Sequence, residues 1–119
     1  MVLYATSPTK AIIGTVTITD IHIDTPRRVW TQYRRRTGIT RSEYDSYMAG
    51  AAQASAIVLA SPRQIATPIP LSFLRSSGSF QPPQSYRYIG PKELWELVAG
   101  HASADELMSH LGATVILAR

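Results

Sequence analysis

Apolar runs separated by polar turns dominate the start of the chain. The run Val2–Ala5 is typical of a short strand, and Thr6–Thr9 supplies Thr, Ser and Pro, which are turn residues. A second strand is predicted over residues 10–24, where β-branched residues alternate with polar ones. The alternation changes phase at Thr19 and Asp20, which predicts a β-bulge there.

Helical spacing follows this strand. Thr25-Pro26 indicates a helix start, because Thr is a good N-cap and Pro suits the first helical position. Apolar residues then recur on one face, and Gly38 is predicted to end the helix. The residues on this face are Val29, Trp30 and Tyr33.

A second helix is predicted to begin at Thr40, because Thr40 and Glu43 have the spacing of a capping box. Gly50 is predicted to end it. Its predicted buried face comprises Tyr44, Tyr47 and Met48. Aromatic residues at this spacing are typical of core packing, with base stacking as the alternative.

The second half of the chain continues with short elements. A strand is predicted over residues 54–65, ended by the two prolines of Thr67–Pro70, and a short helical turn follows over residues 70–74. Gln81–Tyr88 is expected to be extended, because two adjacent prolines stiffen it. Its aromatic side chains then point to one side of the segment.

Two further helices and a strand complete the pattern. One helix opens at Gly90-Pro91, and another opens at Ser103, which is predicted to form a capping box with Glu106. Ala113–Ala118 is an apolar run that we expect to form a strand.

Composition narrows the class of protein. The chain has 119 residues, which predicts one domain, and its net charge of +4 favours an anionic partner. It has no cysteine, no apolar run of membrane-spanning length and no visible leader, so we expect a cytoplasmic protein without membrane contact. His22, His101 and His110 are far apart and lack carboxylates at ligand spacing, so no metal site or cofactor is expected.

Five arginines gather on and beside the first predicted helix. They are Arg27, Arg28, Arg34, Arg35 and Arg36. No acidic residue of that helix offsets them, so the cluster suits phosphate contacts. A solvated helix face, with the last three arginines favouring the helix dipole, gives the same pattern.

Two other stretches carry candidate binding chemistry. Pro8 biases Ser7 toward an extended backbone, so a hydroxyl lies near the ammonium of Lys10, a pairing that suits a phosphate or a carbonyl. The alternative is a solvated turn. Gln84 and Ser85 follow a rigid double proline, and an amide, a hydroxyl and an aromatic ring are groups that read a base. The same residues would otherwise satisfy buried backbone groups. The candidate ligand-binding residues are Ser7, Lys10, Gln84, Ser85, Tyr86 and Arg87.

Three segments together match one family pattern. In VLYATSPTKAIIG, at Val2–Gly14, a strand leads through Tyr-Ala-Thr-Ser-Pro and a lysine into Ala-Ile-Ile-Gly. Asp24–Tyr47 matches the family's helical insert, and QPPQSYRY, at Gln81–Tyr88, matches its closing motif. These segments resemble the ASCH-domain family of the PUA-like superfamily. The resemblance covers residues 2–99 and implies an α+β fold, a small PUA-like β-barrel with peripheral helices, in a single domain over residues 1–119.

The chain also departs from that family. Members usually carry an upstream block with a Gly-x-Lys-x-x-Glu-x-Arg-like motif, whose lysine is credited with chemistry in catalytic relatives. No Gly-x-Lys-x-x-Glu occurs here, so an inherited activity is in doubt. A barrel without its first strand exposes unpaired edges. Within the extra helix and strand at residues 103–118, Thr114–Leu117 is predicted to repair the barrel, either in its own chain or by forming a homodimer.

Three functions follow as hypotheses. The first is a non-catalytic module that binds nucleic acid, most suitably RNA, in a pocket between Thr6–Lys10 and Gln84–Arg87, with the arginine cluster on phosphates. The second is a small hydrolase, because the resembling family includes amidohydrolases acting on acetylated cytidine and ribonucleases. Lys10 would then act as base or electrostatic partner beside Thr6 or Ser7. The third is a shortened relative that works by protein–protein contact.

Overall fold

The computed structural model describes residues 1–112 and 115–118. Over these residues, the elements are β1 Val2–Ala5, β2 Ala11–Asp24, α1 Pro26–Tyr33, the 3₁₀ turn η1 Arg34–Arg36, α2 Arg41–Met48, β3 Ala54–Pro70, α3 Leu71–Leu74, β4 Tyr86–Ile89, α4 Pro91–Val98, α5 Ala104–Ser109 and β5 Val115–Ala118. The chain forms two compact units. We call Met1–Thr17 with Ser61–Arg119 the sheet unit, and Ile18–Ala60 the insert unit. None of the described helices is long and apolar enough to cross a membrane.

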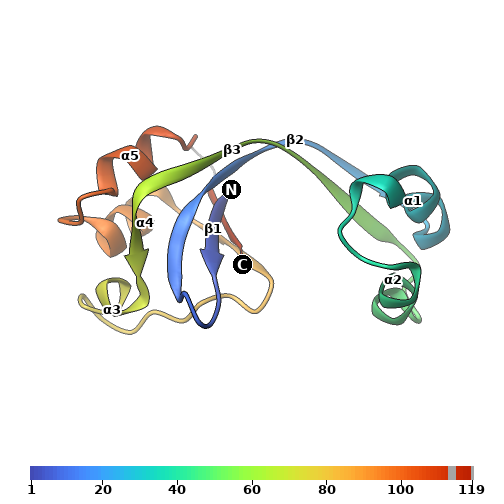
Figure 1. Ribbon diagram of the computed structural model, residues 1–119, viewed down its shortest axis with the longest axis horizontal. Helices are drawn as coiled ribbons and strands as arrows, with labels where there is room; N and C mark the ends of the chain where they lie inside the picture. The colour runs from blue at the N-terminus through green and yellow to red at the C-terminus, as the bar shows by residue number, and fades with distance from the viewer. Residues whose placement is uncertain (113–114, 119) are drawn as a thin grey trace. The chain divides into compact units, whose positions relative to one another are not determined.

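The strands form one sheet in the order β3-β2-β1-β5-β4 (Figure 1). The predicted hairpin is confirmed, because β1 and β2 pair antiparallel with Ala5 opposite Ala11. The register shifts between Leu3 and Tyr4, which marks an irregularity near the start of β2. The bulge expected at Thr19 stays a prediction.

The sheet is open over the described residues, with β3 and β4 at its two edges. The helices and strands confirm the mixed α+β class. The closed β-barrel that the resemblance implied is not formed over the described residues. Closure requires the two edge strands to tilt and pair with each other. Here β4 has four residues and β3 has 17, so the short edge matches little of the long one.

The C-terminal strand β5 pairs within its own chain. It runs parallel to β1 and antiparallel to β4, so both of its edges carry ladder hydrogen bonds. This is the first of the two arrangements expected for Thr114–Leu117, and it leaves no edge of β5 for a strand-sharing homodimer. Ala113 and Thr114 themselves lie outside the described residues.

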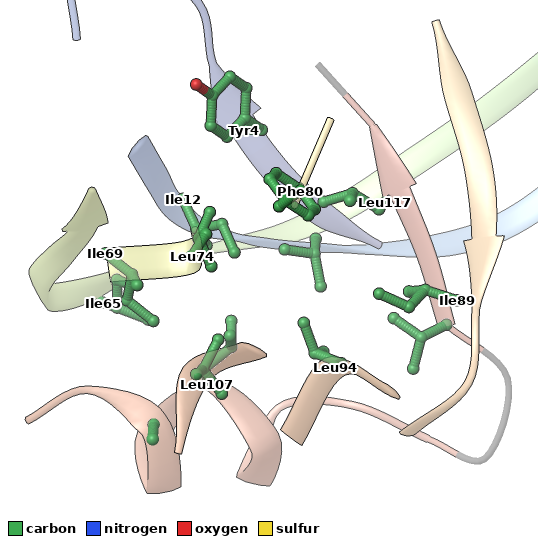
Figure 2. Packing of buried hydrophobic residues seen from close by; sticks show 14 residues of the cluster. Tyr4, Ile12, Ile65, Ile69, Leu74, Phe80, Ile89, Leu94, Leu107 and Leu117 are labelled. Atoms are coloured by element: carbon green, nitrogen blue, oxygen red, sulfur yellow. The ribbon is translucent and has the colours of Figure 1, made fainter. Parts of the chain in front are cut away.

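Apolar side chains from the helices fill the core of the sheet unit. Figure 2 shows Leu94 of α4 and Leu107 of α5 pointing toward the strands, where Ile12, Ile69 and Leu117 meet them. All five side chains are fully buried. Burial of one such side chain stabilises a fold by about 1.5–3 kcal/mol, so this layer fixes α4 and α5 against the sheet.

The strand β3 is longer than predicted. β3 continues through Thr67 to Pro70, because an edge strand tolerates prolines whose missing N–H faces away from the ladder.

The capping box predicted for Ser103 and Glu106 is not formed. Instead, the Ser103 hydroxyl accepts from the Thr67 N–H (3.0 Å) and donates to its carbonyl (2.7 Å), while Glu106 accepts from the Ala66 N–H. Both side chains therefore bind α5 to β3.

The helix starts predicted for the insert unit are confirmed. The Thr25 hydroxyl accepts from the Arg28 N–H, and Thr40 and Glu43 form both bonds of a capping box. The first helix ends earlier than expected, because Arg34–Arg36 leave the α-helix and form the 3₁₀ turn η1.

The predicted buried face of α2 is only partly correct. Tyr44 is buried and Met48 is half-buried, as expected, but Tyr47 is 79% exposed. Positions 44 and 48 are four residues apart and share one line along the helix, whereas position 47 lies at its border. The small core of this unit, around Val29 and Tyr33, reaches Met48 and leaves Tyr47 outside.

Candidate functional site

The two stretches with candidate binding chemistry arrive at the same end of the sheet. Leu3 of β1 pairs with Ala118 of β5, which pairs with Tyr86 of β4. From this row, β1 continues into the Thr6–Lys10 turn, and the chain enters β4 from Gln84–Ser85. Because paired strands are about 4.8 Å apart, β1 and β4 run about 10 Å apart at this row, with β5 between them. We call this region the sheet-end site.

The turn holds Lys10 in an unusual backbone conformation. Its φ angle is +48°, a left-handed region that costs a residue other than glycine about 1–2 kcal/mol. Its N–H donates to the Thr6 carbonyl (3.2 Å), and its own carbonyl accepts from the Leu71 N–H (2.9 Å). Thr6, Ser7 and Lys10 are all exposed. The surrounding hydrogen bonds therefore fix a strained lysine at the surface, and such strain is concentrated at functional sites.

The double-proline stretch presents its polar side chains outward. Pro83 is buried and anchors the segment, while Gln84 and Ser85 are exposed. No hydrogen bond joins the side chain of Gln84 or Ser85 to another described residue. Over the described residues, the alternative role of satisfying buried backbone groups is therefore not observed for either side chain.

The next two residues have different environments. Tyr86 is 56% exposed, with its ring 6.4 Å from that of Tyr88 on the same face of β4. Arg87 forms an ion pair with Glu93 (3.2 Å) beside the ring of Phe80. Tyr86 thus lies largely in solvent, whereas Arg87 is engaged in an ion pair of the fold.

Tyr4 belongs to the same sheet end, and the sequence pattern gave no sign of this. Its ring is buried, and Figure 2 shows its oxygen pointing away from the labelled core residues. Burial alternates along β1, so a tyrosine at a buried position looks in the sequence like any apolar core residue. Only the structure shows where its hydroxyl points, and so whether the residue does more than fill the core.

The arginine cluster lies in the insert unit. Arg27, Arg28 and Arg34–Arg36 are exposed. Arg28 lies 3.8 Å from Asp24, while no ion pair among the described residues involves Arg27 or Arg34–Arg36. Most of the cluster is therefore uncompensated positive charge, as phosphate contacts require.

Two polar groups stabilise the insert unit itself. The Thr25 N–H donates to Asp24 (2.7 Å) and lowers the pKa of this carboxyl, with smaller contributions from His22 and Arg28. The Tyr44 hydroxyl donates to the Pro26 carbonyl (2.6 Å), and burial raises the pKa of Tyr44. Asp24 therefore stabilises the start of α1, and Tyr44 connects α2 to α1.

Histidine and carboxylate side chains do not gather at one point. Among residues 1–112 and 115–118, no group of three His, Cys, Asp or Glu side chains has metal-binding geometry. His22 lies 3.5 Å from Asp24, and His101 accepts from the Ser103 N–H. These contacts give the histidines local structural partners.

Known proteins provide a comparison for this geometry. No protein-family model matches the chain. It is 32% identical over 98 residues to the ASCH domain-containing ribonuclease of Zymomonas mobilis subsp. mobilis, a match that covers 82% of this chain and 66% of that protein. A segment of 58 residues is 33% identical to the large ribosomal subunit protein uL22 of Ureaplasma parvum serovar 3, covering 49% of this chain and 19% of that protein.

Solved structures give the same relationship. The crystal structure of ASCH from Zymomonas mobilis matches with a TM-score of 0.71 at 32% identity, covering 82% of this chain and 68% of that one. A serine-to-alanine and a tyrosine-to-phenylalanine variant of that protein match with the same TM-score of 0.71. This chain therefore spans about two thirds of the length of the Zymomonas protein.

Proposed function

Since the chain belongs to the ASCH family, we propose that it binds single-stranded RNA and cleaves the RNA backbone at the sheet-end site. The observation that carries the proposal is the strained, exposed Lys10, held by two backbone hydrogen bonds at the sheet end that also receives Gln84–Ser85. The name of the Zymomonas relative as a ribonuclease supports the same reaction class.

The chemistry of this site suits a phosphodiester. Cleavage forms a P–O bond from an attacking hydroxyl, the ribose 2′-OH or water, which gives up its proton to the solvent, and it breaks the P–O bond to the leaving oxygen, which takes up a proton from the solvent. Extra negative charge builds up on the phosphate oxygens during this exchange. The ammonium of Lys10, carried on a backbone that two hydrogen bonds hold, stabilises that charge more in the transition state than in the ground state. The exposed hydroxyls of Ser7 and Ser85 donate hydrogen bonds to the phosphate or the ribose. Tyr86 stacks on a neighbouring base.

The two stretches of the proposed site are carried by strands at one end of the sheet. Only β5 lies between β1 and β4 there, so a short nucleotide chain can contact both stretches. Gln84 supplies an amide that both donates and accepts, as reading a base edge requires. Single-stranded RNA is favoured because its bases are unstacked and free to enter.

The test is a cleavage assay on a labelled single-stranded RNA with the full chain. Lys10→Ala is expected to lower the cleavage rate by about 100-fold or more, as the loss of one transition-state charge contact does. Lys92→Ala is the matched control, because Lys92 is the other lysine of the chain and lies exposed on α4. It should leave the rate unchanged.

Two further variants test hydroxyl groups on both sides of the site. Ser85→Ala, beside β4, and Tyr4→Phe, on β1, each remove a single hydroxyl, and each is expected to reduce cleavage while the protein stays folded. Equal rates for the wild type and Lys10→Ala would refute the assignment. Salt-dependent RNA binding without any cleavage would instead support the binding module that the sequence suggested first.

A further inference from the structure

The insert unit contains a groove that the sheet-end site does not use. It has a volume of about 450 Å³ and is lined by side chains of α1, η1, α2 and the first part of β3. Its aromatic lining comes from Trp30 and Tyr33 of α1 and from Tyr44 and Tyr47 of α2, and Ile57 lines it from β3. All of its lining residues belong to the insert unit, so the groove is complete within that unit.

Most aromatic rings of the groove are already packed, but Tyr47 is not. The rings of Trp30 and Tyr44 are 4.9 Å apart, and Tyr33 contacts His22. Tyr47 is 79% exposed, and no ring or cation among the described residues stacks on it. Covering the exposed Tyr47 ring with a ligand would be favourable, because it would remove apolar surface from water.

The charge around the groove selects the chemistry of that ligand. Arg36 lines the groove, with its guanidinium 5.8 Å from the centre of the Tyr33 ring. Arg34 and Arg35 precede it in the same exposed turn.

The acidic residues of the unit do not offset this charge. Asp24 faces His22 and Arg28, Asp45 pairs with Arg41, Glu43 completes the capping box, and Asp20 accepts from the Ile21 N–H. The groove is therefore apolar and aromatic inside, with unpaired positive charge beside it.

We propose that this groove is a second RNA-binding site, in which Tyr47 stacks on an unpaired base and Arg35 and Arg36 hold the adjacent phosphates. Every base has a π-face, and stacking on an aromatic side chain combined with arginine contacts is how proteins hold single strands. The ligand rests on the proposed function, because it is the same class of RNA. The groove itself is argued only from the insert unit.

Other occupants fit the observations less well. A second copy of the chain, related by a two-fold axis at the groove, would bring two arginine turns together at like charge. Duplex RNA keeps its bases stacked inside the helix and offers no free face to Tyr47. An apolar peptide would fill the groove but would leave Arg34–Arg36 without a partner.

The experiment measures the binding of a labelled single-stranded RNA of about 12 nucleotides by fluorescence anisotropy. All proteins carry Lys10→Ala, so that the probe stays intact. Tyr47→Ala is expected to weaken binding by about tenfold or more, while Tyr47→Phe keeps the ring and stays near the parent. Trp95→Ala is the matched control, because it removes an aromatic side chain that is 42% exposed on α4, outside the groove.

A second arm tests the arginines. Changing Arg35 and Arg36 to alanine should reduce the slope of log affinity against log salt by about 1.4, or 0.7 for each lost phosphate contact on a single strand. Arg63→Ala, an exposed arginine of the sheet unit, should affect binding less than the double variant.

The outcomes separate this inference from the proposed function. Binding by Tyr47→Ala equal to that of its parent overturns the groove, whether or not the chain cleaves RNA. If Tyr47→Ala weakens binding and the wild-type chain does not cleave RNA in the separate cleavage assay, the groove is supported and the ribonuclease is removed. A Tyr47→Ala variant that changes only the sedimentation coefficient assigns the groove to a second copy and also overturns the proposal.

Discussion

The strained backbone of Lys10 makes a prediction in which two variants lose the same activity but differ in stability. Lys10→Ala and Lys10→Gly both remove the ammonium, so both should lose cleavage to the same extent. They differ in backbone preference, because only glycine adopts a φ of +48° without a steric cost. The comparison of the two variants therefore isolates the strain from the charge.

The magnitude follows from two opposing terms. A left-handed conformation costs a residue with a Cβ about 1–2 kcal/mol, which glycine avoids. Glycine also gives the unfolded chain more freedom, which costs about 0.4–1 kcal/mol. Lys10→Gly should therefore be more stable than Lys10→Ala by about 0.5–1 kcal/mol, or about 2–4 °C in Tm for a chain of this size.

The assay is thermal and urea unfolding of the two variants beside the cleavage rate. Ser61 provides a matched control, because its φ is +50° and it lies outside the sheet-end site. Ser61→Gly should exceed Ser61→Ala in stability by a similar amount while cleavage stays unchanged. If Lys10→Gly is no more stable than Lys10→Ala, then the turn stores no strain, and the argument from its conformation fails.

Three further predictions concern the scaffold. Ser103→Ala should destabilise the protein by about 1–3 kcal/mol in urea unfolding, because it leaves the Thr67 N–H and carbonyl without a buried partner; the exposed Ser109→Ala should cost clearly less. Tyr44→Phe should cost about 1 kcal/mol by the same measurement, since it removes one hydrogen bond to α1 without creating a cavity. The pKa of Asp24 in the folded protein lies below its ordinary 3.8, so the stability that the ionised carboxylate contributes is present above pH 3.8 and is lost as the pH falls through the lower folded value. Asp24→Asn should therefore make the free energy of unfolding fall less steeply with pH in this acid range. An unchanged dependence of stability on pH would contradict a stabilising role for Asp24.

Local patterns determined most elements. The capping box at Thr40, the helix start at Thr25-Pro26 and the hairpin around Thr6–Lys10 were predictable because their hydrogen bonds join residues close in sequence. The sequence allowed Gln84 and Ser85 either to face a ligand or to bind buried backbone groups. In the structure Pro83 is buried, and Gln84 and Ser85 are exposed.

The errors have a common physical origin. Ser103 and Glu106 had the spacing of a cap, but β3 lies within reach, and its unpaired backbone groups bind the same side chains. Tyr47 had the spacing of a buried face, but the core of the insert unit is too small to cover the border of α2. In each case a partner distant in sequence decides where the side chain goes.

The sequence by itself therefore determined the family pattern, the helix caps and the residue types that a phosphate or a base requires. The tertiary structure alone decided that β5 lies between β1 and β4, that the sheet stays open over the described residues, and that Lys10 and Ser85 reach one end of it. The reason is that caps and turns are satisfied within a few residues, whereas strand order depends on which distant backbones meet.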